Sequence, residues 1–228
     1  FIRIKFLGDI HCIGCGRRSK KSFSQGYCYR CFTTLPQCDT CIMSPEKCHY
    51  HAGTCRDAEW GDTYCFTDHF VYLSNTSGVK VGITRGNQLP TRWIDQGAVQ
   101  ALPIVEVPNR YLAGITEVAL KNHYADKTSW QKMLKNDLNE LSLAEARDYL
   151  LDYVPEELEE FVKYREPIQQ LHFPVLSYPE KVKSMKLDST PIIEKKLTGI
   201  KGQYLIFKDG RVMNVRAHEG CRVELEVG

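Results

Sequence analysis

Residues 70–84 read FVYLSNTSGVKVGIT, which is two short apolar runs joined by a polar turn. Val, Ile and aromatic residues favour strands, and the Ser77-Gly78 pair favours a turn, so this segment predicts a β-hairpin. A third apolar run, over residues 98–107, predicts another strand, which Pro108 ends. These three strands predict one small sheet.

Two helices are expected around this sheet. The run TRWIDQ begins a short helix at Thr91, and Gly97 ends it. From Arg110 the apolar residues recur at helical spacing, which predicts a longer helix that contains Glu117. The strands and helices together predict an α/β core over residues 67–135.

Three side chains of this core form a minimal set for phosphodiester cleavage, namely Tyr72 on a strand, Arg92 on the first helix and Glu117 on the second. The planar guanidinium of arginine suits phosphate oxygens, and a carboxylate can hold a divalent cation. Each residue also has a structural interpretation. Tyr72 fits a strand, and Arg92 can pair with Asp95 one turn further on. Glu117 fits a partly solvated helix face, so the residue types alone leave both interpretations open.

The chain has 228 residues, of which 43% are hydrophobic and 25% charged, as in an ordinary globular protein. No apolar run approaches the roughly 18 residues that cross a bilayer, so we expect no membrane partner. Phe1 stands first in place of Met, and we expect the chain to start inside a longer one. Ile2, Ile4 and Phe6 alternate with basic residues, which predicts a half-buried strand over residues 1–11 and not a signal peptide.

Four of the ten cysteines form two C-x₂-C pairs separated by twelve residues. Each pair can direct two sulfurs at one ion, and the segment between the pairs is long enough for a hairpin that brings them together. Four sulfurs leave no coordination position for water, so the ion has a structural role. The spacing therefore predicts a zinc ribbon with the ligands Cys12, Cys15, Cys28 and Cys31.

A second group of cysteines and histidines follows at once and predicts a second structural zinc ion. Some of these thiols can instead be buried and free, since cysteine packs well as a small hydrophobe. Both ions belong to one predicted zinc-binding module, residues 12–66. Zinc thiolates in place of disulfides favour a cytoplasmic protein. The expected ligands of the second ion are Cys38, Cys41, Cys48 and Cys55, with His51 and Cys65 as alternates.

The net charge of +2 conceals a segregation of charge along the chain. Residues 1–66, 67–135 and 171–228 each carry +3, whereas residues 136–170 carry −7. A polyanion such as nucleic acid is therefore attracted to three segments and repelled by one. A basic cluster beside the first zinc site can either contact phosphates or compensate zinc thiolates, and both interpretations stand. Its members are Arg17, Arg18, Lys20 and Lys21.

The last two segments differ in composition. Residues 136–170 predict an acidic helical segment, with one helix capped by Ser142 and another that begins at Pro155. Residues 171–228 turn to strands, with a hairpin at an Asp-Gly turn. The N-terminal strand is expected to pair with these strands and to close a small β-barrel-like unit. The chain as a whole is predicted to be α+β.

The core resembles the GIY-YIG nuclease superfamily over about residues 68–134. Residues 71–72 (VY) stand where that family has the end of its first motif, and residues 80–82 (KVG) where it has Tyr-Ile-Gly. Arg92 matches the arginine of its first helix, and Glu117 matches its metal-binding glutamate. The whole chain also resembles an uncharacterised bacterial family in which cysteine knuckles precede stretches like KVGITR and RWIDQGA.

The resemblance to the nucleases implies a mechanism with three roles. Tyr72 positions or deprotonates the nucleophile, Arg92 stabilises charge on the phosphate, and Glu117 holds one Mg²⁺ or Mn²⁺. Lys80 stands where the family has its second tyrosine, and His69 lies nearby as a substitute for proton transfer.

Nucleic acid is the partner that the resemblance implies, and Arg85 joins Lys80 and Arg92 as its expected contacts. Two functions follow from the sequence. One is a zinc-stabilised nucleic-acid-binding protein that acts as a divalent-metal-dependent endonuclease. The alternative is a non-catalytic module that binds nucleic acid or protein through the same fold. The sequence does not distinguish DNA from RNA and does not indicate an oligomeric state.

Overall fold

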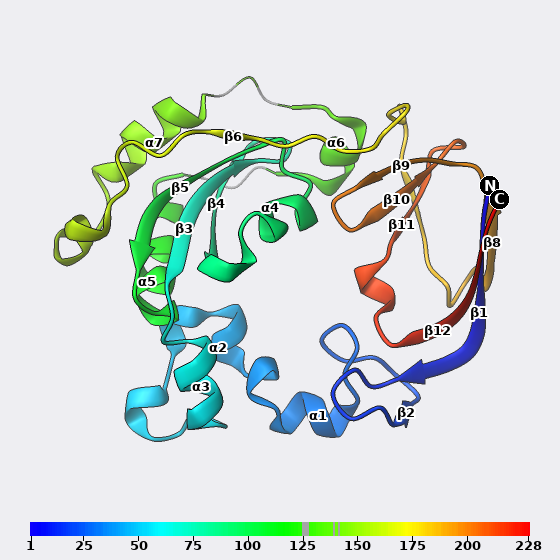
Figure 1. Cartoon of the computed structure of the whole chain (residues 1–228), viewed down its shortest axis with the longest axis horizontal. Coiled ribbons are helices and arrows are strands. Elements are labelled where there is room, and N and C mark those ends of the chain that lie inside the picture. The colour runs from blue at the N-terminus through cyan, green and yellow to red at the C-terminus, as the bar shows by residue number, and fades with distance from the viewer. Residues whose placement is uncertain (125–127, 139, 141) are drawn as a thin grey trace. The chain divides into compact units, whose positions relative to one another are not determined.

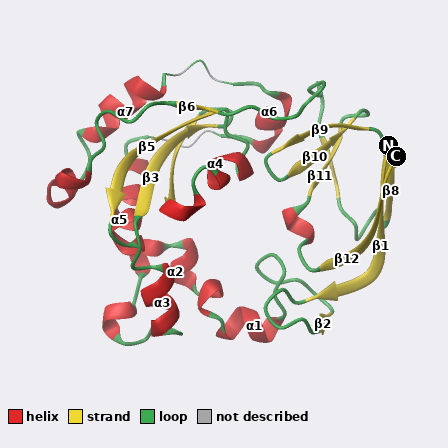
Figure 2. Ribbon diagram, viewed as in Figure 1, coloured by secondary structure: helices red, strands yellow, loops and turns green. Residues whose placement is uncertain are grey.

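The computed structural model describes residues 1–124, 128–138, 140 and 142–228. The chain divides into two compact units (Figure 1). Unit 1 contains residues 1–39 and 173–228, and it is formed mostly of strands (Figure 2). Unit 2 contains residues 40–172 and mixes strands with helices. The zinc-binding module predicted for residues 12–66 is thus divided between the two units.

An antiparallel four-stranded sheet forms the centre of unit 2, in the order β4-β3-β5-β6. β3 and β4 form the predicted hairpin, with Tyr72 opposite Gly82. The third predicted strand, β5, pairs with the other edge of β3, with an irregularity between Val71 and Tyr72. The three predicted strands are confirmed. The strands are β3 (His69–Asn75), β4 (Val79–Arg85), β5 (Gln100–Val107) and β6 (Gln169–Gln170).

Unit 2 contains the α-helices α2 (Thr40–Met43), α3 (Ala58–Tyr64), α4 (Thr91–Asp95), α5 (Arg110–Lys121), α6 (Trp130–Lys135) and α7 (Leu143–Leu151). It also contains the 3₁₀ turns η2 (Pro45–Lys47), η3 (Tyr50–Ala52), η4 (Gly86–Gln88) and η5 (Glu156–Phe161). The two helices predicted for the core, α4 and α5, are confirmed.

Helices cover both faces of the sheet (Figure 1). α5 and α7 pack on the face that carries Val71 and Leu73, where they form the main apolar core of unit 2. α4 lies on the opposite face, where Trp93 packs against Tyr72. Successive side chains of a strand point to opposite faces. Tyr72 therefore faces α4, whereas its neighbours on β3 face α5.

The acidic segment contains α7 and η5. The Ser142 hydroxyl accepts a hydrogen bond from the Glu145 amide at 3.3 Å, which caps α7 as predicted. The second predicted element is a six-residue 3₁₀ helix in place of an α-helix. Four of its six residues are glutamates, and their mutual repulsion opposes a longer helix.

Unit 1 contains two separate four-stranded sheets. In the first, β1 (Ile2–His11) pairs with β12 (Cys221–Val227), β8 (Ile192–Lys195) and β2 (Arg18–Ser19). The second has the order β7 (Lys183–Met185), β11 (Arg211–Asn214), β10 (Tyr204–Phe207) and β9 (Leu197–Lys201). Unit 1 also contains α1 (Tyr29–Thr34), η1 (Pro36–Cys38) and η6 (Arg216–His218).

The N-terminal strand pairs with C-terminal strands as predicted, but the described strands do not close into a barrel. Only Lys196 separates β8 from β9, so the chain passes directly from one sheet into the other. Ile2, Ile193 and Phe207 belong to one apolar cluster that both sheets bury. The two sheets therefore stabilise each other by side-chain packing, and hydrogen bonds do not join them into one closed sheet.

The two ends of the chain meet within unit 1 (Figure 1). The amino group of Phe1 donates a hydrogen bond to the Gly228 carbonyl at 2.7 Å. Among the described residues, no helix combines the length and the apolar character that crossing a bilayer requires.

Candidate functional site

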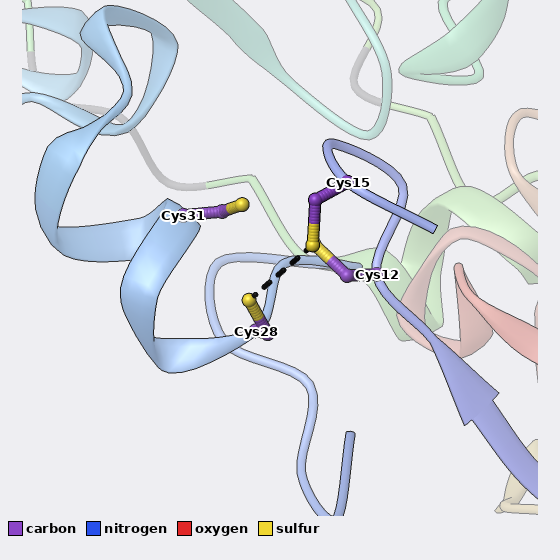
Figure 3. A group of neighbouring side chains, drawn as sticks. All are labelled: Cys12, Cys15, Cys28 and Cys31. Carbon is purple, nitrogen blue, oxygen red and sulfur yellow. Dashed lines mark hydrogen bonds between the residues drawn. The ribbon is translucent and has the colours of Figure 1, made fainter. Parts of the chain in front are cut away.

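The first predicted metal site is assembled in unit 1. The sulfurs of its four cysteines all lie within 4.8 Å of one another. The Cys15 and Cys28 sulfurs are 3.8 Å apart. Cys12 and Cys15 lie in the turn that follows β1, while Cys28 precedes α1 and Cys31 lies within it. Figure 3 shows the four side chains directed toward one common point.

The backbone around Cys12 explains why this turn forms. The Cys12 amide donates to the Arg17 carbonyl at 2.9 Å, and the Gly16 amide donates to the Cys12 carbonyl at 2.8 Å. Gly16 has a φ of 71°, a left-handed conformation that glycine adopts without strain. A further bond, from Ile13 to the Gly26 carbonyl at 2.9 Å, holds the turn beside the segment that leads to Cys28.

The four thiols influence one another strongly. Burial raises the pKa of Cys12, but the backbone N–H groups of Cys28, Cys15 and Gly14 outweigh it and lower the value to about 6. Burial and hydrogen bonds to the other three thiols raise the pKa of Cys31 to about 12. One thiolate thus forms readily, and its charge opposes ionisation of the rest.

This donor set suits a zinc ion. Four sulfurs in C-x₂-C pairs are a common tetrahedral set for zinc. A dication offsets the repulsion that opposes further ionisation, so it favours all four thiolates together. Since four protein ligands fill a tetrahedral site, no open position is left for catalysis. The Cys12, Cys15, Cys28 and Cys31 cluster can therefore hold a structural zinc ion.

The second predicted set is less compact. Cys38 belongs to unit 1, whereas Cys41, Cys48 and Cys55 belong to unit 2. Among the described residues, these last three sulfurs do not all lie within 4.8 Å of one another. A ring nitrogen of His49, which was not among the expected ligands, lies within 4.8 Å of the Cys41 sulfur. The second zinc ion stays a prediction.

The alternate ligands have different surroundings. His51 is exposed in η3. Burial raises the pKa of Cys65, the Arg110 guanidinium lowers it, and the charges of Cys48 and Cys55 raise it again. Cys65 stays an alternate ligand of the second ion.

Tyr72 is the centre of the other candidate site. Its side chain is 0% exposed, and its ring meets Trp93 edge to face with centroids 6.0 Å apart. Its hydroxyl donates a hydrogen bond to Gln96 Oε1 at 3.1 Å. Burial raises the pKa of Tyr72, whereas Arg92 lowers it through its charge and a hydrogen bond. The Glu117 carboxylate raises this pKa.

Arg92 lies on α4, which packs on the face of Tyr72, whereas Glu117 lies on α5, which packs on the opposite face of the sheet. Glu117 is 14% exposed at its side chain, and it pairs with Lys121 one turn later at 2.9 Å. Gln96 is a residue that the sequence analysis did not single out. Its position one turn after Arg92 in the RWIDQG run was the available signal.

Gly82 provides the space for the Tyr72 ring. A Cβ atom at position 82 would lie 2.7 Å from both Cζ and Oη of Tyr72. Real Cβ atoms do not approach other atoms so closely, so a side chain at position 82 would displace the tyrosine. This contact accounts for glycine in the Lys80-Val81-Gly82 stretch.

The remaining candidates lie on both faces of the sheet. Lys80 shares the face of Tyr72, because it lies opposite Ser74 in the hairpin. Arg85 and His69 lie opposite each other on the other face. The Arg85 guanidinium stacks over the Tyr64 ring, 5.1 Å from its centroid. Lys80, Arg85 and Arg92 are the three basic residues expected to contact nucleic acid. The sheet places Arg85 on one face and Lys80 on the other.

His69 is 0% exposed, and its Nδ1 contacts the Thr67 carbonyl at 2.7 Å. That carbonyl can only accept, so Nδ1 carries the proton and donates. Burial lowers the pKa of His69 to about 4, and the charges of Arg110 and Arg85 act in the same direction. The imidazole is therefore neutral near pH 7, and it faces away from Tyr72.

The fold and the cysteine cluster together define an α+β protein with four cysteines that can hold a metal ion. The chain belongs to the family described as "Protein of unknown function (DUF2797)", which matches residues 1–223. This confirms the predicted resemblance of the whole chain to an uncharacterised family. No curated protein and no solved structure matches the chain. The resemblance to GIY-YIG nucleases has no support from these comparisons and stays a prediction.

Proposed function

We propose that this protein is a zinc-stabilised nucleic-acid-binding protein whose core cleaves phosphodiester bonds with the help of one divalent metal ion. The observation that carries the proposal is the packing of Tyr72 against α4, the helix that bears Arg92, with the Tyr72 hydroxyl donating a hydrogen bond to Gln96 at the end of that helix. Glu117 lies on α5, on the other face of the sheet, and its charge raises the pKa of Tyr72. The Tyr72–Gly82 pairing across the hairpin supports the same assignment, because it leaves room for the tyrosine ring.

Each residue has one role in this proposal. Arg92 binds a non-bridging phosphate oxygen and stabilises the charge that develops there. Tyr72 orients the attacking water through its hydroxyl oxygen, whose own proton is held by Gln96. The raised pKa of Tyr72 favours positioning over proton abstraction, because the phenol stays protonated near pH 7. Lys80, on the same face, supplies a further contact to phosphate.

Glu117 is the residue that would hold Mg²⁺ or Mn²⁺. When bound, such an ion lowers the pKa of its water and neutralises the leaving oxygen. A single carboxylate suits Mg²⁺, which keeps most of its waters and uses phosphate oxygens as further ligands. Lys121 is 2.9 Å from the Glu117 carboxylate, and it must move aside for an ion to bind.

The non-catalytic alternative has observations of its own. Tyr72 is 0% exposed, so substrate reaches its hydroxyl only if neighbouring side chains move. Glu117 already has a cationic partner in Lys121. In this alternative the same fold binds nucleic acid or protein, and Arg92 and Glu117 are structural.

A cleavage assay separates these two functions. Single- and double-stranded DNA and RNA are incubated with the full chain and Mg²⁺ or Mn²⁺. We expect Glu117→Gln and Arg92→Lys to reduce cleavage on the order of a hundredfold or more. Glu157→Gln, an exposed carboxylate of the same unit, is the matched control and should cleave normally. Binding without cleavage by the wild type refutes the enzyme and favours the alternative.

The zinc part of the proposal has its own measurement. We propose two zinc ions per chain, one held by the four-cysteine cluster and one by Cys38, Cys41, Cys48 and Cys55. Reduced thiols of this kind persist in the cytoplasm, which is the compartment we propose. Elemental analysis of the purified chain should give two zinc ions. A content of one zinc ion per chain would contradict the second site. A content below one ion per chain would contradict both sites.

A further inference from the structure

The zinc-ribbon segment carries charge of one sign only. Residues 10–37 contain five basic residues and no aspartate or glutamate. If the four ligands are thiolates around one Zn²⁺, the site contributes −2 and the segment keeps a net charge of +3. The basic residues therefore exceed what the metal site needs for neutrality. The five are Arg17, Arg18, Lys20, Lys21 and Arg30.

One of the five is already neutralised. Arg18 forms an ion pair with Asp9 at 2.6 Å. The other four are exposed. Their exposure favours phosphate contact over thiolate compensation, because a group that offsets a buried thiolate must lie against it.

Aromatic contacts connect the loop that carries Lys20 and Lys21 to α1, which carries Arg30. The Phe23 ring meets the Tyr29 ring edge to face at 5.5 Å and stacks with the Phe32 ring at 5.9 Å. Phe23 is two residues from Lys21, so it holds the Lys20-Lys21 segment beside α1. Tyr29, next to Arg30, is 64% exposed. We call Arg17, Lys20, Lys21, Tyr29 and Arg30 the ribbon face.

The two units differ in charge in the same sense. Unit 1 contains 17 basic and 9 acidic residues, whereas unit 2 contains 13 basic and 19 acidic residues. A polyanion is therefore attracted to the unit with the ribbon face and repelled on average by the unit with Tyr72. Nucleic acid that reaches Tyr72 needs favourable contacts elsewhere on the chain.

We infer that the ribbon face binds single-stranded nucleic acid, an inference that rests on the proposed nucleic-acid function and adds the surface responsible. The four exposed basic side chains of the ribbon face bind successive phosphates. These contacts supply affinity without sequence preference. The exposed Tyr29 ring stacks on an unpaired base, a contact that every base can make. A single strand is favoured because a base in a duplex is already stacked on both sides.

The test uses the zinc-loaded full chain and a labelled oligothymidylate of about 15 nucleotides, without added Mg²⁺. Binding is measured over a series of salt concentrations. Replacing Arg17, Lys20, Lys21 and Arg30 by alanine should reduce the slope of log affinity against log salt by about 3. A charge-matched control replaces four exposed lysines elsewhere in unit 1, and it should leave the slope nearly unchanged. These lysines are Lys181, Lys183, Lys186 and Lys208.

Tyr29 gives a second, uncharged variant. Tyr29→Ala should weaken binding on the order of tenfold at every salt concentration, because a stacking contact is lost and no charge changes. Tyr29→Phe keeps an aromatic ring and should bind as the wild type does. Zinc content and the thermal midpoint confirm that each variant is folded.

The outcomes separate this inference from the proposed function. If the wild type binds oligothymidylate and the ribbon variants bind equally well, the inference is overturned while the proposed function stands. If the wild type binds no nucleic acid at low salt, both are overturned. Equal competition by polyglutamate, or tighter binding of a duplex, identifies a different partner and also overturns the inference.

Discussion

His69 makes a quantitative prediction about the pH dependence of folding. Its imidazole is 0% exposed in β3, and Arg85 and Arg110 act on it as like charges once it is protonated, while Asp68 acts in the opposite sense. Burial and these arginines lower its pKa from 6.5 to about 4. Protonation therefore favours the unfolded chain, in which the imidazole is solvated.

The sign and size follow from the two pKa values. A folded-state pKa below the unfolded-state pKa gives stability that is present above about pH 6.5 and lost as pH falls toward 4. Between about pH 7 and pH 5 the loss from His69 alone is about 2 kcal/mol, and between about pH 7 and pH 4 it is about 3 kcal/mol.

A comparison with His69→Asn isolates this contribution. The asparagine amide can replace Nδ1–H as donor to the Thr67 carbonyl, but it does not titrate. Chemical denaturation of the wild type and the variant at about pH 7 and pH 5 gives four unfolding free energies. Loss of zinc and titration of other groups occur in both chains, so they cancel in the difference.

We expect the variant to be less stable than the wild type near pH 7 and to lose about 2 kcal/mol less on acidification. An equal loss in both chains refutes the argument. It would show that His69 is solvated or paired when protonated, and that its burial does not control its charge.

Three further predictions concern single contacts. Gly82→Ala should destabilise the chain by about 1–3 kcal/mol in thermal or chemical unfolding, because its Cβ would lie 2.7 Å from the Tyr72 hydroxyl; unchanged stability would contradict that packing. Asn109→Ala should cost about 1 kcal/mol, since the Asn109 side chain accepts the Leu112 amide at 2.9 Å and caps α5. Cys31→Ser should reduce the zinc content by one ion per chain and lower the midpoint of unfolding, and an unaltered zinc content would remove Cys31 from the site.

The core elements were predictable because their signals are local. The hairpin β3-β4, strand β5 and helices α4 and α5 all lie where the apolar pattern and the turn residues indicate. The four-cysteine cluster was predictable for a similar reason. Each C-x₂-C pair is formed by one turn, so only the approach of two turns was left to the fold.

The division into two units was not predictable from such signals. Unit 1 joins residues 1–39 to residues 173–228 through the pairing of β1 with β8 and β12. These pairings link strands that lie far apart in the sequence, and no local pattern encodes them. The same limit explains why a closed barrel was expected and two packed sheets are present.

Residue types and spacing determined on their own that this chain has a four-cysteine cluster able to hold a metal ion, a hairpin core and an uneven distribution of charge. Tertiary structure alone decided which side chains share surroundings. It buried Tyr72 against Trp93, gave Glu117 a partner in Lys121 and held Phe23 against Tyr29. Burial and proximity depend on how whole elements pack, and these two quantities determine whether a tyrosine, a carboxylate or a basic cluster can act on a ligand.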